Sequence, residues 1–568
     1  MLRFLHIENF KAFGKRTLIP FAPITLIFGE NSAGKSSILQ ALNLLKQSFE
    51  SKESGSILIS RAEDGLVDLG SFQELLFDHD LVHTLSLRLG FDLPDKVDRY
   101  LTSQIYAIGD FGLRGIPRLD FDKANRYHNK PLYEKNRTGA LELQFTRHSI
   151  EQEIQLKQLE IFLPDHKTVA RYALIPREEE SIIDGLIDRL LQYGYKMQCT
   201  HVTDDPELWR PFFETTKDSQ AKTLALLEEL KQYVHNHIKD STQRMEFEND
   251  YGPGAASDGI LLLEEEIAFY SSDFGFEEYV ERMRGFQHQT ALYFDGLVQK
   301  SVNLPRDFVD DFFTKHHYFD SFMRGHNRLR HGIDVLGVTH FVRHAFEQAL
   351  HSLFPMGPYR KPSARWYIFR GTSPPHVGYE GELLPDFLLR NTSLVREVNS
   401  WLQRLDIGYR LEIKSTDLHF GDFFEARLQD LRRKKSVDVS LKDVGFGISQ
   451  ILPFIVQSLV GQRQIISIEQ PEVHIHPRLQ ADIGELLAES IRPPRENQFL
   501  IETHSEHLVL RLQRLVREGR LKARDVAIVY ISRGETGSQA HHLRLDDEGE
   551  FIDDWPGGFF LERLRELV

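Results

Sequence analysis

Two stretches of the sequence carry residues whose types and spacing could do phosphate chemistry. The first, "GENSAGKSS" at 29–37, has a glycine, four residues, a second glycine, a lysine and a serine. An apolar run at 24–28 precedes it and an apolar-periodic segment follows from Ser37. This is the phosphate-loop pattern in its strand–loop–helix context. Its glycines let backbone N–H groups face phosphate oxygens, and the helix N-terminus adds the positive end of its dipole.

The phosphate loop predicts ATP and Mg²⁺ as cofactors. The Lys35 ammonium is expected to bridge the β- and γ-phosphates, and the Ser36 hydroxyl to ligate Mg²⁺. The residues expected to contact the nucleotide are Gly29, Asn31, Ser32, Ala33, Gly34, Lys35, Ser36 and Ser37.

The second stretch, "IISIEQPEVHIHP" at 465–477, ends a strand-like run on a carboxylate. The β-branched residues favour a strand, and Pro471 breaks it. Glu469 is therefore predicted to be the metal-side carboxylate that accompanies Ser36. Many ATP-hydrolysing machines place two acids in tandem here, whereas this chain has Gln470 in the second position.

Two further segments are expected to reach the same site. The apolar run 499–501 leads to His504, and polar residues past the ends of parallel strands line a ligand crevice. Gly445 and Gly447 in "DVGFGISQ" precede an apolar helix at 448–460, which makes a second anion-ready helix start. The alternatives are a capping histidine and an ordinary glycine turn before a core helix.

Composition limits the class of protein. The 568 residues are 41% hydrophobic, contain no apolar run of 18, and include one cysteine, Cys199. A membrane span, a disulfide framework and a cysteine-based metal site are therefore not expected, and the predicted location is the cytoplasm. The net charge of −15 argues against nucleic-acid binding by the whole surface. A local basic cluster, Arg324, Arg328 and Arg330, could contact DNA or RNA phosphates or be a solvated surface.

The elements that must position these residues suggest an α/β fold in three parts. Residues 1–175 are predicted to form an N-terminal ATPase lobe whose later part alternates as antiparallel strands. Residues 176–340 carry helical periodicity and are predicted to be a helical insertion, an arm or cap. Residues 341–568 are predicted to form a C-terminal ATPase lobe.

The order and spacing of the motifs resemble the SMC, RecF and OLD group of ABC-type ATPases. "IENFKAFG" resembles the opening strand, "DVGFGISQ" the signature, "IEQPEVHIHP" the Walker B motif and "ETHSEHL" the switch-histidine loop. "EQPEVHIHP" and "WPGGFF" resemble, more narrowly, a bacterial AAA-type ATPase subfamily often encoded in antiviral defence islands.

The resemblance implies an ABC/RecF-like head with a mixed sheet, an antiparallel β lobe and a helical insertion. Two such heads sandwich two ATP molecules, and the signature of one head faces the γ-phosphate on the other. Gly445 then takes the place of the usual signature serine and Gly447 that of its glycine. Glu469 takes the Mg²⁺-side position, and Gln470 the position of the general base.

The base position leaves three alternatives open. An amide cannot accept a proton at neutral pH, and loss of a general base costs about 10²–10⁴ in rate. Glu472 could serve as base if the chain turns at Pro471, or His474 or His504 could orient the water. We favour the third alternative, slow hydrolysis in which ATP mainly joins two heads.

Two functions follow as expectations. The first is a dimeric or higher-oligomeric, ATP-switched sensor or scaffold that controls a separate effector such as an antiviral nuclease. Only about 60 residues follow His504, too few for the nuclease domain of OLD proteins, so the effector is expected on another chain. The alternative is a RecF-like DNA-repair or chromosome-maintenance ATPase acting directly on DNA.

Overall fold

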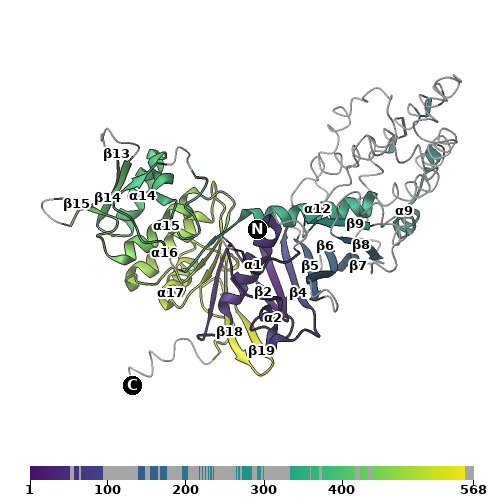
Figure 1. Ribbon diagram of the computed structural model, residues 1–568, viewed down its shortest axis with the longest axis horizontal. Coiled ribbons are helices and arrows are strands. Elements are labelled where there is room, and N and C mark those ends of the chain that lie inside the picture. Colours follow the sequence, from purple (N-terminus) through teal and green to yellow (C-terminus); the bar gives the residue numbers. More distant parts are fainter. Residues whose placement is uncertain are drawn as a thin grey trace. The chain divides into compact units, whose positions relative to one another are not determined.

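A computed structural model describes most of both predicted lobes. The described residues are 1–51, 57–62, 65–93, 138–147, 154–163, 167–174, 195–202, 271–284, 291–295, 298–299, 333–358, 360–369, 374–415, 423–432 and 436–556, with single positions between 217 and 268. They divide into two compact units. The first unit comprises 1–51, 59–89 and 348–568, and the second comprises 52–58 and 90–347 (Figure 1).

A six-stranded sheet forms the centre of the first unit. Its order is β11 (Leu353–Met356), β16 (Ile465–Glu469), β17 (Gln498–Glu502), β3 (Ile24–Gly29), β18 (Val526–Gly534) and β19 (Gly537–Leu543). The first five strands are parallel, and β19 returns antiparallel along β18. The parallel strands are almost wholly buried, which explains their continuous apolar runs.

Helices follow three of the parallel strands, as the motif pattern predicts: α1 (Lys35–Glu50), α16 (Pro477–Ser490) and α17 (Glu506–Arg517). Another helix, α15 (Phe446–Val460), directly precedes β16. Their starts carry expected caps: the His476 ring accepts from the Arg478 N–H, and the Ser505 hydroxyl accepts from the Leu508 N–H. Apolar side chains of α15, α16 and α17 share one core with β16 and β17.

Smaller elements complete the first unit. Strands β1 (Leu2–Glu8) and β2 (Thr17–Pro20) pair antiparallel. A second sheet holds β12 (Tyr367–Ile368), β14 (Phe423–Asp430), β13 (Tyr409–Ser415) and β15 (Val437–Ser440). The remaining helices are α2 (Phe72–Leu75), α13 (Leu384–Leu389) and α14 (Thr392–Arg404), with short 3₁₀ turns at Phe77–His79 and Ala523–Asp525.

The second unit contains the predicted antiparallel strands. Their order along the chain and in space is β5 (Thr138–Arg147), β6 (Ile154–Leu163), β7 (Lys167–Leu174), β8 (Tyr195–Val202), β9 (Ala291–Asp295) and β10 (Val298–Gln299). Helix α9 (Phe276–Arg284) also lies here. Strand β4 (Leu85–Asp92) and helix α12 (Ile333–Ser352) each contain a boundary between the units.

The observed division differs from the predicted one in two respects. Strands β5, β6 and β7, expected in the N-terminal lobe, belong to the second unit. Residues 195–202 and 291–295 were expected in a helical insertion, but they form strands that extend the sheet beyond β7. Sheet pairing thus continues past the predicted boundary at 176, because a short amphipathic run gains backbone hydrogen bonds from a neighbouring strand edge whatever its own periodicity. The fold combines a mixed sheet around the phosphate-loop strand with an antiparallel β lobe, as predicted. None of the described helices combines the length and apolarity needed to cross a membrane.

Candidate functional site

The phosphate loop connects β3 to α1 and needs glycine at two positions. Gly29 has φ 144°, and a Cβ there would lie 2.1 Å from the Ile531 carbonyl oxygen. Gly34, directly before α1, has φ 94°, and its Cβ would lie 2.6 Å from that of Ala12. L-residues rarely adopt this backbone conformation, so both the dihedral and the space select glycine.

Other contacts hold the loop in place. The Lys35 ammonium donates to the carbonyl oxygens of Gly29 at 3.1 Å and Glu30 at 2.8 Å. The Ser538 hydroxyl donates to the Ala33 carbonyl at 2.7 Å, and Arg533 donates to that of Asn31 at 2.8 Å. Ser32 adopts φ 60°, and the Ser37 N–H donates to the Gly34 carbonyl. The loop is thus braced by its own lysine and by β18–β19.

Burial affects the charge of this lysine. Lys35 is buried, and its desolvation lowers the pKa of the ammonium, while the nearby Glu502 carboxylate raises it. A phosphate anion would compensate the same charge.

A second carboxylate lies between the phosphate loop and Glu469. The parallel register pairs Glu469 at the end of β16 with Glu502 at the end of β17. The Ser36 hydroxyl donates to Glu502 Oε1 at 3.1 Å. Sequence reasoning missed Glu502, although a signal existed, because both strands end in Ile-Glu.

Burial raises the pKa of both carboxylates. Burial and the Glu502 charge raise the pKa of Glu469 to about 7, against the opposing effect of Arg360. Burial also raises the pKa of Glu502, against the Ser36 hydrogen bond and the Lys35 charge. Glu502 is 4% exposed, and its Oε2 has no hydrogen-bond partner among the described residues.

The chain turns at Pro471, and this turn gathers the other predicted residues. Gln470 has φ 43°, and its N–H donates to the Glu502 carbonyl at 2.7 Å. Glu472 Oε1 accepts from the His504 N–H at 2.6 Å, so the turn after β16 is tied to the loop after β17. Burial raises the pKa of Glu472, and desolvation with the Lys35 charge lowers that of His504.

The two glycines before and in α15 differ in their surroundings. A Cβ on Gly447 would lie 2.4 Å from the His474 carbonyl oxygen, so this glycine packs against the turn after β16. A Cβ on Gly445 would meet nothing within 4 Å, and its φ of −56° suits any residue. Gly447 therefore has a role within its own chain, whereas Gly445 is open.

A buried arginine, Arg360, acts electrostatically on Glu469, and sequence reasoning missed it too. Arg360 is 6% exposed, and its Nε and Nη1 have no hydrogen-bond partner among the described residues. Burial lowers the pKa of Arg360 to about 10, which Tyr379 and Glu469 oppose. Burial and the Glu469 charge raise the pKa of Tyr379 to about 12. Only the short sequence "MGPYR" after β11 could have pointed to it.

The residues around Ser36 suit Mg²⁺. Hard oxygen donors are the ligands that Mg²⁺ prefers, and it usually takes one or two protein ligands together with phosphates and water. The Ser36 hydroxyl and the unsatisfied Glu502 carboxylate fit that need. Within the described ranges, no cluster of three or more His, Cys, Asp or Glu side chains could hold a metal by itself.

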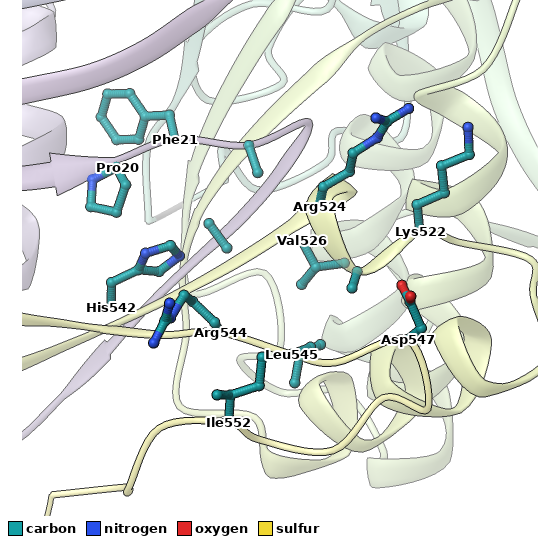
Figure 2. A pocket seen from close by; sticks show the side chains of 13 residues that line it. Pro20, Phe21, Lys522, Arg524, Val526, His542, Arg544, Leu545, Asp547 and Ile552 are labelled. Atoms are coloured by element: carbon teal, nitrogen blue, oxygen red, sulfur yellow. The ribbon is translucent and has the colours of Figure 1, made fainter.

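A groove in the surface of the first unit lies away from the phosphate loop. It is lined by residues at the starts of β3 and β18 and the end of β19, among them Phe21, Arg524, His542 and Arg544 (Figure 2). The phosphate loop follows the opposite ends of β3 and its parallel neighbours, so this groove and the phosphate loop occupy opposite edges of the sheet. The predicted basic cluster Arg324, Arg328 and Arg330 lies outside the described residues.

Comparison with known proteins identifies a family. The model of the AAA ATPase domain matches residues 1–251 and 391–509. No curated protein matches the chain.

Solved structures that resemble the chain include SMC head domains. That of Pyrococcus furiosus, bound to the C-terminal domain of ScpA, has 12% identity and a TM-score of 0.32, covering 100% of this chain and 98% of that one. That of Thermotoga maritima has 10% identity and a TM-score of 0.32, covering 96% and 99%. At this level of similarity, the partners and activities of these proteins are not assigned to the chain.

Proposed function

The chain belongs to the AAA ATPase domain family, and we propose that it is a slow, ATP-switched ATPase whose heads pair around ATP to control a separate effector. The observation that carries the proposal is the braced phosphate loop, with Ser36 on a buried carboxylate and an amide, Gln470, where a general base is expected. The effector, such as a nuclease in antiviral defence, rests on the motif resemblance.

Each residue of the site has a task in this proposal. Lys35 exchanges its two carbonyl contacts for phosphate oxygens, and the N–H groups of the loop and of the start of α1 surround the phosphates. Mg²⁺, when bound, neutralises charge on the phosphates. Ser36 and the carboxylates at the ends of β16 and β17 are the residues that would hold it.

Slow hydrolysis follows from the distribution of carboxylates. Gln470 cannot take a proton from water, and Glu472 is engaged by the His504 N–H. Positioning and electrostatics remain and support residual turnover. Bound ATP then remains unhydrolysed long enough to hold two heads together.

Lysine replacement tests the nucleotide site. Lys35→Ala should weaken ATP binding by about 100-fold or more, because a charged hydrogen-bond donor is lost from the phosphates. Calorimetric titration measures it, with Lys15→Ala as a control at an exposed lysine outside the site. Unchanged affinity in Lys35→Ala would rule out the assigned site.

Gly445 tests the pairing of heads. Gly445→Glu fits the backbone and the open space, so ATP binding to one head should be retained. If this helix start faces the γ-phosphate of a partner, the added negative charge should abolish ATP-dependent association in sedimentation experiments. Association equal to wild type, with ATP and Mg²⁺ present, would refute the paired arrangement.

A further inference from the structure

Strand β19 is the last strand of the six-stranded sheet, and part of its outer edge is open. It pairs antiparallel with β18, so its residues turn their backbone N–H and C=O groups alternately towards β18 and away from it. The Ser538 N–H donates to the Ala12 carbonyl oxygen at 2.7 Å, so Ser538 turns away from β18. By the same alternation, Ala540, His542 and Arg544 also turn their backbone groups outward.

The chain covers the two ends of this edge but not its middle. Beyond Ser538, the next bonded position is Arg544, whose N–H donates to Asp553 Oδ2 at 2.8 Å and whose carbonyl accepts from the Ile552 N–H at 2.9 Å. Between these positions, the outward backbone groups have no hydrogen bond to another segment among the described residues. Six residues of strand span about 20 Å, so the opening has room for a few residues of an added strand.

An open edge of this kind is a template for a further strand. Unpaired N–H and C=O groups on an edge strand pair readily with an extended polypeptide, and many proteins prevent this by placing Lys or Pro on the edge. The sequence of β19, GSQAHHL, contains neither. The opening can therefore accept an extended segment through backbone hydrogen bonds.

Two hollows in the surface meet at this opening. One is the groove of Figure 2, the other lies between β2 and the first residues of β19, and both are lined by Pro20 and His542. Their volumes, about 730 and 450 Å³, lie within the range of binding pockets. Apolar side chains line the larger one, among them Phe21, Val526 and Leu545, which are buried. The side chains of an added strand would therefore meet an apolar surface.

The lining of the two hollows is positively charged, although the chain has a net charge of −15. Its described charged residues are the cations Lys15, Arg16, Lys522, Arg524 and Arg544 and the carboxylate Asp547. Arg544 pairs with Asp553, whereas Lys15, Lys522 and Arg524 form no ion pair within the described part of the chain. Figure 2 shows Lys522 and Arg524 across the groove from Arg544. These unpaired cations favour an acidic ligand.

We propose that the groove docks a short extended segment of a partner protein. The segment pairs with the open backbone of β19 at Ala540 and His542, turns apolar side chains towards the groove, and carries acidic residues that meet Lys522 and Arg524. The inference goes beyond the proposed function, which names no docking surface. It is independent of ATP hydrolysis, because the groove lies at the opposite edge of the sheet from the phosphate loop.

The observations favour a polypeptide over two other occupants. A nucleic acid would use the cations, but its phosphates would use neither the strand edge nor the apolar lining. A second copy of the chain, docked through the same surface, would place cations against cations.

Peptide selection provides the probe for this surface. Random ten-residue peptides displayed on phage are selected on the immobilised full chain, and the tightest binder is labelled for fluorescence anisotropy. We expect peptides in which Asp or Glu accompanies β-branched or aromatic residues, because these residue types favour strands and suit the groove. Selected peptides without acidic residues would contradict the proposal.

Charge reversal tests the position of the peptide. Lys522→Glu combined with Arg524→Glu should weaken binding of the selected peptide by about tenfold or more and reduce its salt dependence, because two attractive contacts become repulsive. The matched control, Arg396→Glu combined with Arg410→Glu, makes the same change of net charge at exposed residues of α14 and β13. It should leave the affinity unchanged, and equal losses in the two variants would overturn the assignment to the groove.

Backbone methylation of the peptide tests strand pairing without altering the protein. In an added strand, only every second N–H group of the peptide faces β19. Methylation of two alternate N–H groups should therefore weaken binding by about tenfold or more in one register and by about threefold or less when shifted by one residue. Equal losses in the two registers would rule out pairing with the edge of β19.

Three further outcomes would assign the surface to another occupant and overturn the proposal. The first is a short oligo-dT that displaces the selected peptide and binds wild type at least as tightly. The second is tighter peptide binding after truncation at Pro556, which would show that the chain's own later residues occupy the groove. The third is loss of self-association in the charge-reversed variant, measured by sedimentation. Thermal unfolding at the wild-type temperature establishes that each variant is folded.

Discussion

Charged side chains are buried at one edge of the six-stranded sheet, where the parallel strands end, and exposed at the opposite edge, where they begin. At the edge that carries the phosphate loop, Lys35, Glu502 and Arg360 are buried, and burial is the main cause of their pKa shifts. At the groove on the other edge, Arg544 and Asp553 are exposed enough to be solvated, and they pair through two hydrogen bonds from the guanidinium.

The difference shows that the presence of a groove does not by itself identify the functional part of the molecule. The groove is a hollow in the surface, and Arg544, which lines it, already pairs with Asp553 (Figure 2). At the phosphate-loop edge, Glu502 Oε2, Glu472 Oε2 and two nitrogens of Arg360 are buried without a partner among the described residues. A folded chain tolerates such groups where a ligand supplies the missing contacts, so we place the chemistry there.

The largest expected effect is a change of ATPase rate at the phosphate-loop edge of the sheet. Gln470→Glu should restore a proton acceptor near the γ-phosphate and raise the ATPase rate by up to about 100-fold. The ATP-held pair of heads should then be shorter-lived. Steady-state phosphate release measures the rate, and sedimentation measures the association.

Glu472→Gln is the matched counterpart of that variant. If Glu472 is already the base, its amide abolishes turnover and Gln470→Glu brings little gain, since two nearby carboxylates raise each other's pKa. A Gln470→Glu enzyme no faster than wild type, together with an inactive Glu472→Gln, would contradict slow hydrolysis by an absent base.

The next largest effect is a pH dependence of the free energy of unfolding, caused by the buried Glu469 carboxyl at the phosphate-loop edge. Folding raises the pKa of Glu469 from 4.5 to about 7. Between pH 4.5 and 7, the Glu469 carboxyl is therefore protonated in the folded state and ionised in the unfolded state. Stability should therefore fall as pH rises from about 4.5 through 7, by at most about 3 kcal/mol. Relative to Glu469→Gln, metal-free wild type should lose stability over this range in calorimetric unfolding. Parallel curves for the two proteins would show that Glu469 is not buried as described.

The smallest effect is expected at the groove. The Arg544 guanidinium holds the pKa of Asp553 at about 2, so this carboxylate is ionised throughout the usual pH range. Asp553→Asn should leave nucleotide affinity and ATPase rate unchanged, because an exposed ion pair contributes little and lies at the opposite edge of the sheet. A change in ATP affinity in this variant would mean that the groove is coupled to the phosphate loop.

Sequence reasoning succeeded where one continuous segment contains the chemistry. The strand, the glycine loop and the helix start were recognised at 24–37, and the carboxylate after 465–468 ends its strand as expected. It failed for β8 and β9, which were expected in a helical insertion. Short apolar runs are ambiguous in periodicity, and only a neighbouring strand decides between helix and sheet.

By itself, the sequence determined which local backbone could cradle a phosphate, because Gly29 and Gly34 adopt dihedrals that other residues avoid. It also determined that an amide stands at position 470. Only the tertiary structure decided which carboxylate meets Ser36. Ser36 and Glu502 are 466 residues apart, and their contact depends on β17 pairing beside β3 in one register. The electrostatic effect of Arg360 on Glu469 likewise depends on the pairing of β11 with β16, because strand order is a property of the folded sheet and not of any one segment.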